Sequence, residues 1–194
     1  MPLDLESLLR ETGALLRGHF RLSSGLHSPG YVQCALLLEH PRNARAIGEA
    51  LAAKLSAMSP AKIVAPALGG VIIGYTVAEA LGLPSIFTER KEGAMTLRRG
   101  FAIAPGEPVV IVEDVVTTGK STRETAAVIE RLRGRVVGFA SILNRSGKAN
   151  PFDAPYEALM TLALETYEEG SCPLCAAGVS LDAPGSRFSN RVSG

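Results

Sequence analysis

The segment Val109–Ser121, which reads VVIVEDVVTTGKS, constrains the fold more strongly than any other part of this chain. It begins with four apolar, mostly β-branched residues, the pattern of a strand buried on both faces of a parallel sheet. A Thr-Thr-Gly-Lys-Ser loop follows, and a helical pattern begins after the loop. Such a junction binds anions, because backbone N–H groups of the loop and of the helix N-terminus point toward the ligand. The adjacent carboxylates Glu113 and Asp114 are suited to sugar hydroxyls or a bound Mg²⁺.

Two better-known phosphate motifs do not fit this segment. A P-loop has a glycine five residues before its Gly-Lys-Ser, where this chain has Asp114. The G-x-G-x-x-G pattern of dinucleotide-binding folds is also absent from the segment. The remaining alternative is an ordinary strand-to-helix turn with an acidic end, but two neighbouring carboxylates rarely serve packing alone.

Strand and helix patterns alternate along the chain, which indicates an α/β fold with an open, mainly parallel sheet covered by helices on both faces. Further strands are expected at Lys62–Pro66, Ser85–Thr88 and Val136–Leu143. Helices are expected at residues 3–16, with a break or a cap at Gly13, at Val71–Leu81 and at Ser121–Arg133, with another opened by Pro41. The helix Ser121–Arg133 would begin with a capping box formed by Ser121 and Glu124. The segment from Arg90 to Gly100 is expected to be a charged loop. A length of 194 residues suits a single domain.

Composition narrows the range of partners and compartments. A net charge of +1 gives no basic excess, so no nucleic-acid partner is expected. The longest apolar stretch, Ile63–Leu83, contains a proline and several glycines, so a buried strand, loop and helix explain it better than a membrane span. The N-terminus lacks a signal-peptide pattern, and three cysteines without one suggest a reducing compartment. We therefore expect a soluble, cytoplasmic protein with no membrane partner.

Two further segments are candidates for binding a polyanion. Residues 65–71 read APALGGV, and the pair Gly69 and Gly70 would let backbone N–H groups approach an anion closely, although a simple tight turn explains the pair equally well. Residues 87–101 read FTERKEGAMTLRRGF and bring four basic residues together. Such a run is either a solvated charged surface or a mobile lid whose cations neutralise a departing polyanion.

Four segments taken together resemble the orotate phosphoribosyltransferases. They are HFRLSSGLHSPGYVQ at residues 19–33, ERKEGAMTLRRGF at 89–101, VEDVVTTGKS at 112–121 and SILNRSG at 141–147. The third of them is typical of all type I phosphoribosyltransferases, which bind phosphoribosyl pyrophosphate (PRPP). The first and last indicate the base. The resemblance spans roughly residues 13–147 and implies the type I phosphoribosyltransferase fold, with a small hood mainly in residues 1–40, a core at about 41–165 and a tail at about 180–194 that is partly flexible.

The resemblance also implies roles for particular residues. The ribose 5-phosphate part of PRPP would contact Glu113, Asp114, Val115, Val116, Thr117, Thr118, Gly119, Lys120 and Ser121. Orotate would contact Thr117, Arg145, Ser24 and Tyr31, with the guanidinium of Arg145 on its carboxylate. Ser23 stands where many relatives have a substrate-binding lysine. The pyrophosphate loop would be Leu68, Gly69 and Gly70, and it carries a strained peptide in the family. Relatives of the enterobacterial type have a lysine in place of Gly69.

In this family the lid reaches into the active site of a neighbouring subunit, so the resemblance implies a homodimer. Arg90 and Lys91 match the first two basic residues of the catalytic loop and, with Asp114, are the candidate catalytic residues. Ala94 and Thr96 stand where the best-known members have a lysine and a histidine, so either Arg98 and Arg99 substitute for them or the lid works with fewer cations. Mg²⁺ would be the cofactor, bound through PRPP and in addition by the two strand-end carboxylates.

Two other functions and one motif stay open at this point. A phosphoribosyltransferase for another nucleobase would have little use for Arg145. A PRPP-sensing regulator would need a nucleic-acid-binding surface that the sequence does not indicate. The single C-x-x-C motif, Cys172 to Cys175, is interpreted as a reduced structural turn rather than a metal site, because zinc needs four ligands and the histidines all lie far upstream. A metal shared across a dimer is the alternative.

Overall fold

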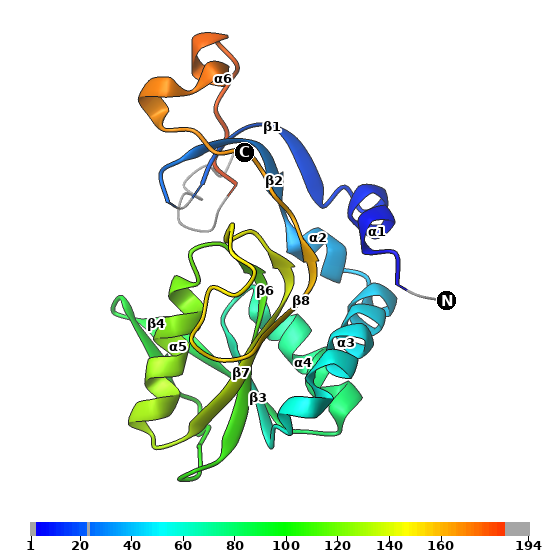
Figure 1. The fold of residues 1–194 in the computed structure, drawn as a ribbon, viewed down its shortest axis with the longest axis vertical. Helices are drawn as coiled ribbons and strands as arrows, with labels where there is room; N and C mark the ends of the chain where they lie inside the picture. The colour runs from blue at the N-terminus through cyan, green and yellow to red at the C-terminus, as the bar shows by residue number, and fades with distance from the viewer. Residues whose placement is uncertain (1–2, 23, 185–194) are drawn as a thin grey trace.

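The computed structural model describes residues 3–22 and 24–184 and places a six-stranded sheet at the centre of the molecule (Figure 1). The strands lie in the order β5 (Ala94–Leu97), β4 (Ser85–Lys91), β3 (Lys62–Pro66), β6 (Pro108–Val116), β7 (Arg135–Asn144) and β8 (Tyr156–Thr161). Every neighbouring pair is parallel except β4 and β5. The mainly parallel α/β sheet that the sequence predicts is therefore confirmed.

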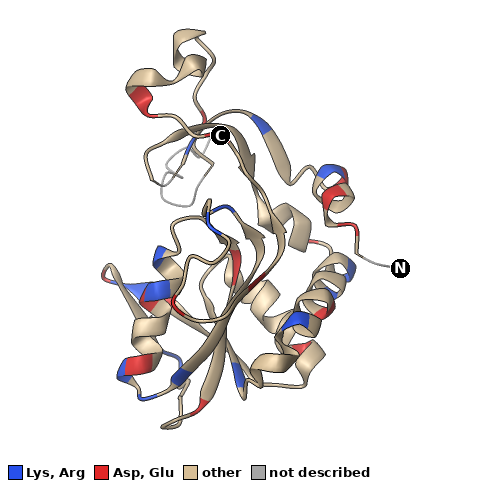
Figure 2. Ribbon diagram, viewed as in Figure 1, with Lys and Arg blue, Asp and Glu red and all other residues tan. Residues whose placement is uncertain are grey.

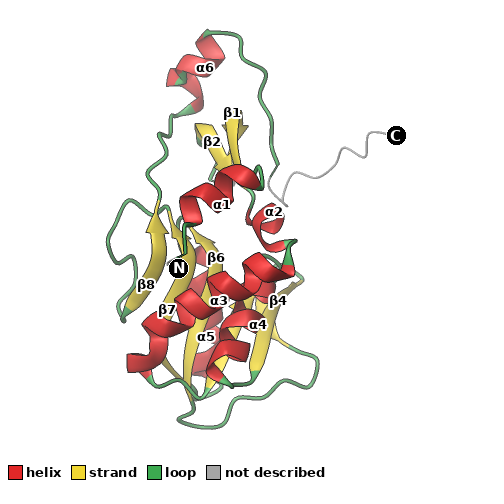
Figure 3. Cartoon of the chain, turned by 90° about the vertical axis from the view of Figure 1, so that its right-hand side faces the viewer, coloured by secondary structure: helices red, strands yellow, loops and turns green. Residues whose placement is uncertain are grey.

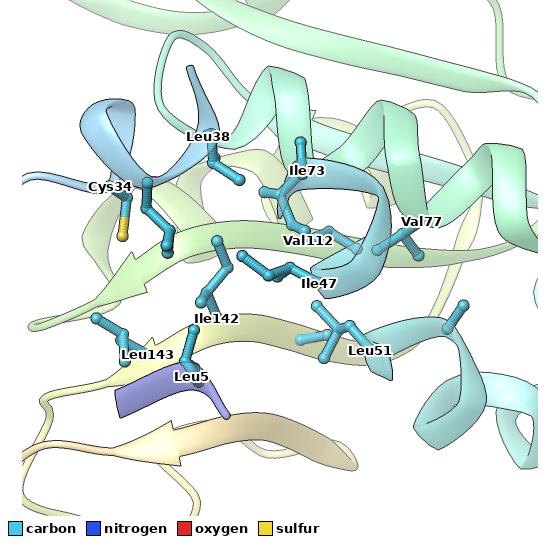
Figure 4. Close-up of a cluster of buried hydrophobic side chains, with 14 of the residues drawn as sticks. Leu5, Cys34, Leu38, Ile47, Leu51, Ile73, Val77, Val112, Ile142 and Leu143 are labelled. Carbon is cyan, nitrogen blue, oxygen red and sulfur yellow. The ribbon is translucent and has the colours of Figure 1, made fainter. Parts of the chain in front are cut away.

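Helices cover both faces of the sheet, because the central strand β6 is apolar on both sides. Val110 and Val112 face the cluster under α3 (Pro41–Leu55) and α4 (Gly70–Leu81), part of which is drawn in Figure 4. Val109 and Ile111, which alternate with them, face the cluster under α5 (Lys120–Arg131). All four side chains are fully buried, so this strand is fixed from both sides and holds its carboxyl end in place.

A second, smaller part of the chain lies over the end of the sheet toward which the parallel strands point (Figures 1 and 3). It contains the antiparallel strands β1 (Leu15–Arg21) and β2 (His27–Val32) together with residues 162–184, and we call it the hood. The C-terminal part of the hood pairs with the hairpin: Tyr167 exchanges two backbone hydrogen bonds of 2.9 Å with His27, and the N–H of Arg21 donates to the carbonyl of Asp182 at 2.8 Å. Both ends of the chain thus build the surface that faces the strand ends.

The remaining helices are short. They are α1 (Leu5–Glu11), α2 (Cys34–Leu38), η1 (Ser56–Met58), η2 (Glu169–Ser171) and α6 (Pro173–Ala176). No helix in the part of the chain that the structure describes combines the length and apolar character needed to cross a bilayer. Acidic and basic positions are interspersed along the ribbon (Figure 2).

Two element predictions differ from the structure, and in both cases glycine geometry explains the difference. The break expected at Gly13 is confirmed, because the helix ends at Glu11 and Gly13 has a φ of 66°. The helical assignment of the residues after it is wrong, since Leu15 and Leu16 belong to a strand. The segment expected as a charged loop is instead a hairpin: β4 continues to Lys91, and β5 returns after Glu92 and Gly93. Both turn residues have positive φ, as a two-residue hairpin turn of type I′ requires.

The predicted capping box at the start of α5 is also wrong. The helix begins one residue earlier than expected, after Gly119 in the left-handed conformation, and no side chain caps it. Glu124 is held instead by ion pairs with Arg90 and Lys120. The N–H of Lys120 donates to the hydroxyl of Thr118 at 3.3 Å, and the N–H groups of Ser121 and Thr122 are left for another acceptor among the described residues.

Candidate active site

A pocket of about 270 Å³ lies where β6 ends and α5 begins. Its lining residues come from the strand end, the loop, the first helical turn and, from above, the hood: Ser24, Glu113, Val115, Thr117, Thr118, Gly119, Lys120, Ser121 and Thr122. A wider hollow of about 730 Å³ elsewhere is lined by α1, α3 and Leu3, and its ionisable residues are all acidic. Only the smaller pocket thus combines a helix N-terminus with hydroxyls and a lysine, the groups that an anion requires.

The loop under this pocket is held in place by a residue that sequence reasoning missed. Arg123 donates to the carbonyls of Thr118 and Pro151, both at 2.6 Å, and its guanidinium lies 5.3 Å from the centre of the Phe152 ring. The same ring blocks the space beside Gly119, where an added Cβ would lie 2.9 Å from it. The loop is therefore fixed by contacts on its outer side, and its pocket side stays open.

The two strand-end carboxylates lie directly against the paired glycines of the loop after β3. A Cβ on Gly69 would lie 2.7 Å from a carboxylate oxygen of Asp114, and one on Gly70 would lie 2.9 Å from the carbonyl of Val112 and 3.1 Å from Glu113. The peptide Ala67–Leu68, one residue earlier, is cis. An added Cβ at either position would therefore displace an atom of β6, so the absence of a side chain allows the loop to approach this strand closely.

Burial and mutual repulsion set the protonation of these acids. Burial raises the pKa of Glu113 well above its usual range, and the neighbouring charge of Asp114 raises it further. Burial also raises the pKa of Asp114, which receives a 2.8 Å hydrogen bond from the N–H of Val115. Because two adjacent buried carboxylates resist ionising together, the pair shares a proton more readily than isolated acids do, and a bound cation would relieve that repulsion.

A second group of polar residues includes Arg145 and Tyr31, whose charges interact. Arg145 follows β7, and its N–H donates to the carbonyl of Val116 at 2.8 Å. Its side-chain Nε is buried without a hydrogen-bond partner in the described part of the chain, and burial lowers the pKa of its guanidinium. Burial, followed by the charge of Asp114, raises the pKa of Tyr31. The fold thus brings Tyr31, Asp114 and Arg145 from three distant segments into electrostatic contact, with an unpaired guanidinium donor among them.

The basic residues of the β4–β5 hairpin differ in how far they are neutralised. Arg90 pairs with Glu124, and Arg98 and Arg99 pair with Glu89 at 3.5 and 2.9 Å. Lys91 is exposed, and no ion pair or hydrogen bond holds it among the described residues.

The structure therefore brings most of the predicted site residues to one end of the sheet. Thr117 to Ser121 and Ser24 line the pocket, and Glu113 is in its wall. Leu68 is 86% exposed beside the glycine pair, and Val116 is buried behind the loop. Ser23 lies outside the described residues, as does most of the tail expected to be flexible. The sequence places Arg123 in the first turn of the predicted helix, but nothing in the sequence indicates that its side chain folds back onto the loop.

Comparison with known proteins agrees with this arrangement. A family model for the phosphoribosyl transferase domain matches residues 35–169. The orotate phosphoribosyltransferase of Carboxydothermus hydrogenoformans is 48% identical over 187 residues, covering 95% of this chain and 98% of that protein. The orotate phosphoribosyltransferase of Thermotoga maritima is 47% identical over 183 residues, covering 94% and 98%.

Among solved structures, the orotate phosphoribosyltransferase of Aeropyrum pernix is similar with a TM-score of 0.67 at 24% identity, covering 81% of this chain and 93% of that one. At this identity the likeness concerns the fold. The domain match over residues 35–169 and the identity of 47–48% over nearly the whole chain show that the chain belongs to the phosphoribosyl transferase family and, within it, to the orotate phosphoribosyltransferases.

Proposed function

We propose that the protein is an orotate phosphoribosyltransferase, which transfers the 5-phosphoribosyl group of PRPP to orotate in the synthesis of pyrimidine nucleotides. The observation that supports this most directly is the position of Arg145. Its Nε is buried without a hydrogen-bond partner among the described residues, and its charge interacts with Tyr31. A buried donor without a partner is costly, so a ligand carboxylate bound by this guanidinium would compensate it.

The pocket at the start of α5 is where we place the 5-phosphate. Thr117, Thr118 and Ser121 offer hydroxyls, Lys120 offers a cation, and the first helical turn offers N–H groups. The outer contacts of Arg123 keep this loop in shape before the substrate arrives. A preformed loop lowers the entropic cost of binding the phosphate.

The base would lie between this pocket and the hood. Arg145 would bind the orotate carboxylate, and Tyr31, Ser24 and Thr117 would contact the ring. A base without a carboxylate would leave the guanidinium buried and unpaired, and this disfavours a phosphoribosyltransferase for another nucleobase.

We place the ribose over Glu113 and Asp114, and the pyrophosphate over Leu68, Gly69 and Gly70. The two strand-end carboxylates fit a Mg²⁺ ion carried by PRPP, because a cation would relieve the repulsion between them. When bound, Mg²⁺ would withdraw charge from the ribose oxygens and the pyrophosphate.

In the transfer, the bond from ribose C1 to the pyrophosphate oxygen breaks with its electron pair, a bond from C1 to N1 of orotate forms, and the proton of N1 passes to the departing pyrophosphate. The ribosyl ring becomes positively charged as these bonds exchange. Asp114 and Glu113 would stabilise that charge, and Lys91 and Arg90 would stabilise the departing pyrophosphate. The hood would exclude water from the reacting carbon. We further propose that the lid acts in a homodimer, in trans, and that the enzyme is cytoplasmic.

A coupled spectrophotometric assay with PRPP and Mg²⁺ tests this proposal. Orotate should be consumed, while adenine, hypoxanthine, xanthine and uracil should not be. Arg145→Ala should raise the KM for orotate about 30-fold or more, the equivalent of a charged hydrogen bond of about 2 kcal/mol, and should leave PRPP binding nearly unchanged. Arg135→Ala, at the opposite end of the same strand, is the matched control and should have no effect.

The outcome of this assay separates the alternatives. Equal orotate KM values for Arg145→Ala and the parent protein would remove the base-binding assignment. Turnover of another base in place of orotate would keep only the wider family. Mg²⁺-dependent PRPP binding without turnover of any base would indicate a regulatory protein.

A further inference from the structure

Two histidines of the hood hairpin and the two cysteines of the C-x-x-C motif meet at one point, although more than 140 residues separate them in the chain. His19 comes from β1, His27 from β2, and Cys172 and Cys175 from the start of α6 and the residues before it. Their ligand atoms all lie within 4.8 Å of one another. The histidines that lie far upstream in the sequence are therefore close to the C-x-x-C motif in the structure, so sequence distance is no argument against a metal site here. None of these residues takes part in the site described above.

Three nitrogen–sulfur distances within the cluster match those of a tetrahedral metal site. A zinc ion with bonds of about 2.0 Å to nitrogen and 2.3 Å to sulfur holds a nitrogen and a sulfur ligand about 3.5 Å apart. The observed distances are 3.5 Å from Cys172 Sγ to His19 Nε2, 3.7 Å from Cys175 Sγ to the same nitrogen, and 3.3 Å from Cys175 Sγ to His27 Nδ1. The two nitrogens are 2.9 Å apart, slightly closer than the roughly 3.3 Å of an ideal tetrahedron.

The tautomer of His19 is fixed in the form that a metal requires. Its Nδ1 lies 2.8 Å from the carbonyl oxygen of Val179, which can only accept, so Nδ1 carries the hydrogen. The lone pair of Nε2 then points at His27 and the two sulfurs. A backbone carbonyl that orients a ligating imidazole in this way is the usual outer contact of a zinc-bound histidine.

The hood has a structural need for such a cross-link. Phe20 and Cys172 are buried in it, but neither belongs to the two apolar clusters that stabilise the sheet. His19 and His27 occupy the position that a small core would fill, with 3% and 1% of their surface exposed. Parts of a protein too small to bury a large apolar surface are commonly stabilised by a metal or by disulfides. Both cysteines are free thiols here.

We propose that His19, His27, Cys172 and Cys175 form a structural zinc site that joins the C-terminal segment to the β1–β2 hairpin. Two thiolates and two imidazoles with no open position are the ligand set of structural rather than catalytic zinc. Cys175 is exposed and provides the path by which the ion enters, whereas the other three ligands are buried. The site depends only on the fold of the hood and not on the substrate assigned to the active site.

The test is the metal content of the full-length chain, purified without a histidine tag under reducing conditions. The expected result is about one zinc ion per chain. The Cys172→Ser/Cys175→Ser double variant should lose it, and Cys34→Ala and His40→Gln, which alter a cysteine and a histidine outside the cluster, should keep it. Replacement of zinc by Co²⁺ should give the ligand-field absorption of a tetrahedral site together with thiolate-to-cobalt charge-transfer bands.

The cobalt spectrum is measured on the unaltered protein, so it does not depend on whether a hood variant folds. A reduced wild-type chain that takes up neither zinc nor cobalt would overturn the proposal. Retention of stoichiometric zinc by the double cysteine variant would do so as well, and a six-coordinate cobalt spectrum without thiolate bands would show that the ion binds elsewhere.

Discussion

Replacement of Gly69 by alanine tests whether the contact between the glycine pair and Asp114 matters for activity. Gly69 has a φ of −56°, which any residue adopts, so the substitution introduces no backbone strain. Its only effect is steric. The new Cβ would lie 2.7 Å from a carboxylate oxygen of Asp114, and restoring an ordinary contact of 3.4 Å requires the carboxylate to move by about 0.7 Å.

A displacement of this size has a calculable cost. Since an error of about 1 Å in the position of a catalytic group can lower the rate about 100-fold, we expect kcat/KM to fall 10- to 100-fold, or about 1.4 to 2.8 kcal/mol of transition-state stabilisation. The free energy of unfolding should fall less, by about 1 kcal/mol, because a flexible side chain and not the core moves. Activity should therefore fall while the protein remains folded.

The measurement is steady-state kinetics with PRPP varied, together with thermal unfolding. Gly170→Ala is the matched control, because that glycine also lacks a positive φ and has no neighbour within 4 Å of an added Cβ. Wild-type kinetics in Gly69→Ala would refute the reasoning, since they would mean that the carboxylate can move freely without any effect on the reaction. An equal loss in the Gly170→Ala control would point to a general effect on folding.

Three other substitutions separate stability from function. Glu113→Gln should stabilise the fold while lowering activity, because the folded-state pKa of Glu113 is raised above its usual value of 4.5. The gain in unfolding free energy should be absent below pH 4.5 and should grow as pH rises toward neutrality. Urea titrations at several pH values would measure this gain. Arg123→Ala removes the two hydrogen bonds that hold the phosphate loop, so it should raise the KM for PRPP about 10-fold. It should also lower the melting temperature by a few degrees, as differential scanning calorimetry would measure. The control Arg131→Ala should change neither quantity. Lys91→Ala should lower kcat at least 10-fold, because its charge would stabilise the departing pyrophosphate. The melting temperature should not change, because no described residue pairs with that side chain. A change in stability with kcat intact would contradict the role of Lys91 in the lid.

The parts of the fold that could be predicted from the sequence are those with strong local patterns. The strand Lys62–Pro66 has the predicted bounds, because its apolar run ends at a proline that is soon followed by two glycines. The helix after it differs by one residue at its start. The phosphate loop could be located because its carboxylates, glycine and hydroxyls are contiguous. The predicted start of α5 is one residue too late. Ser121 and Glu124 match the sequence pattern of a capping box, but the helix begins directly after Gly119, which is in the left-handed conformation.

What could not be predicted depends on contacts between distant segments. Leu15 and Leu16 continue a helical spacing, and only pairing with Val32 and Tyr31 shows that they form a strand. The approach of Tyr31 to Arg145 depends in the same way on the complete fold. The cluster of His19 and Cys172 is the extreme case, because no local pattern links two residues 153 positions apart.

The pairing of Tyr167 with His27 has a consequence for how the protein acquires its shape during synthesis. The sheet around the phosphate pocket is built from neighbouring strand–helix units, so most of it can form while the chain is still being made. The hairpin of the hood is synthesised before the sheet, whereas the segment around Tyr167 that pairs with it is synthesised after the sheet. The hairpin must therefore wait for this later segment, and the phosphate side of the site matures before the side that covers the base.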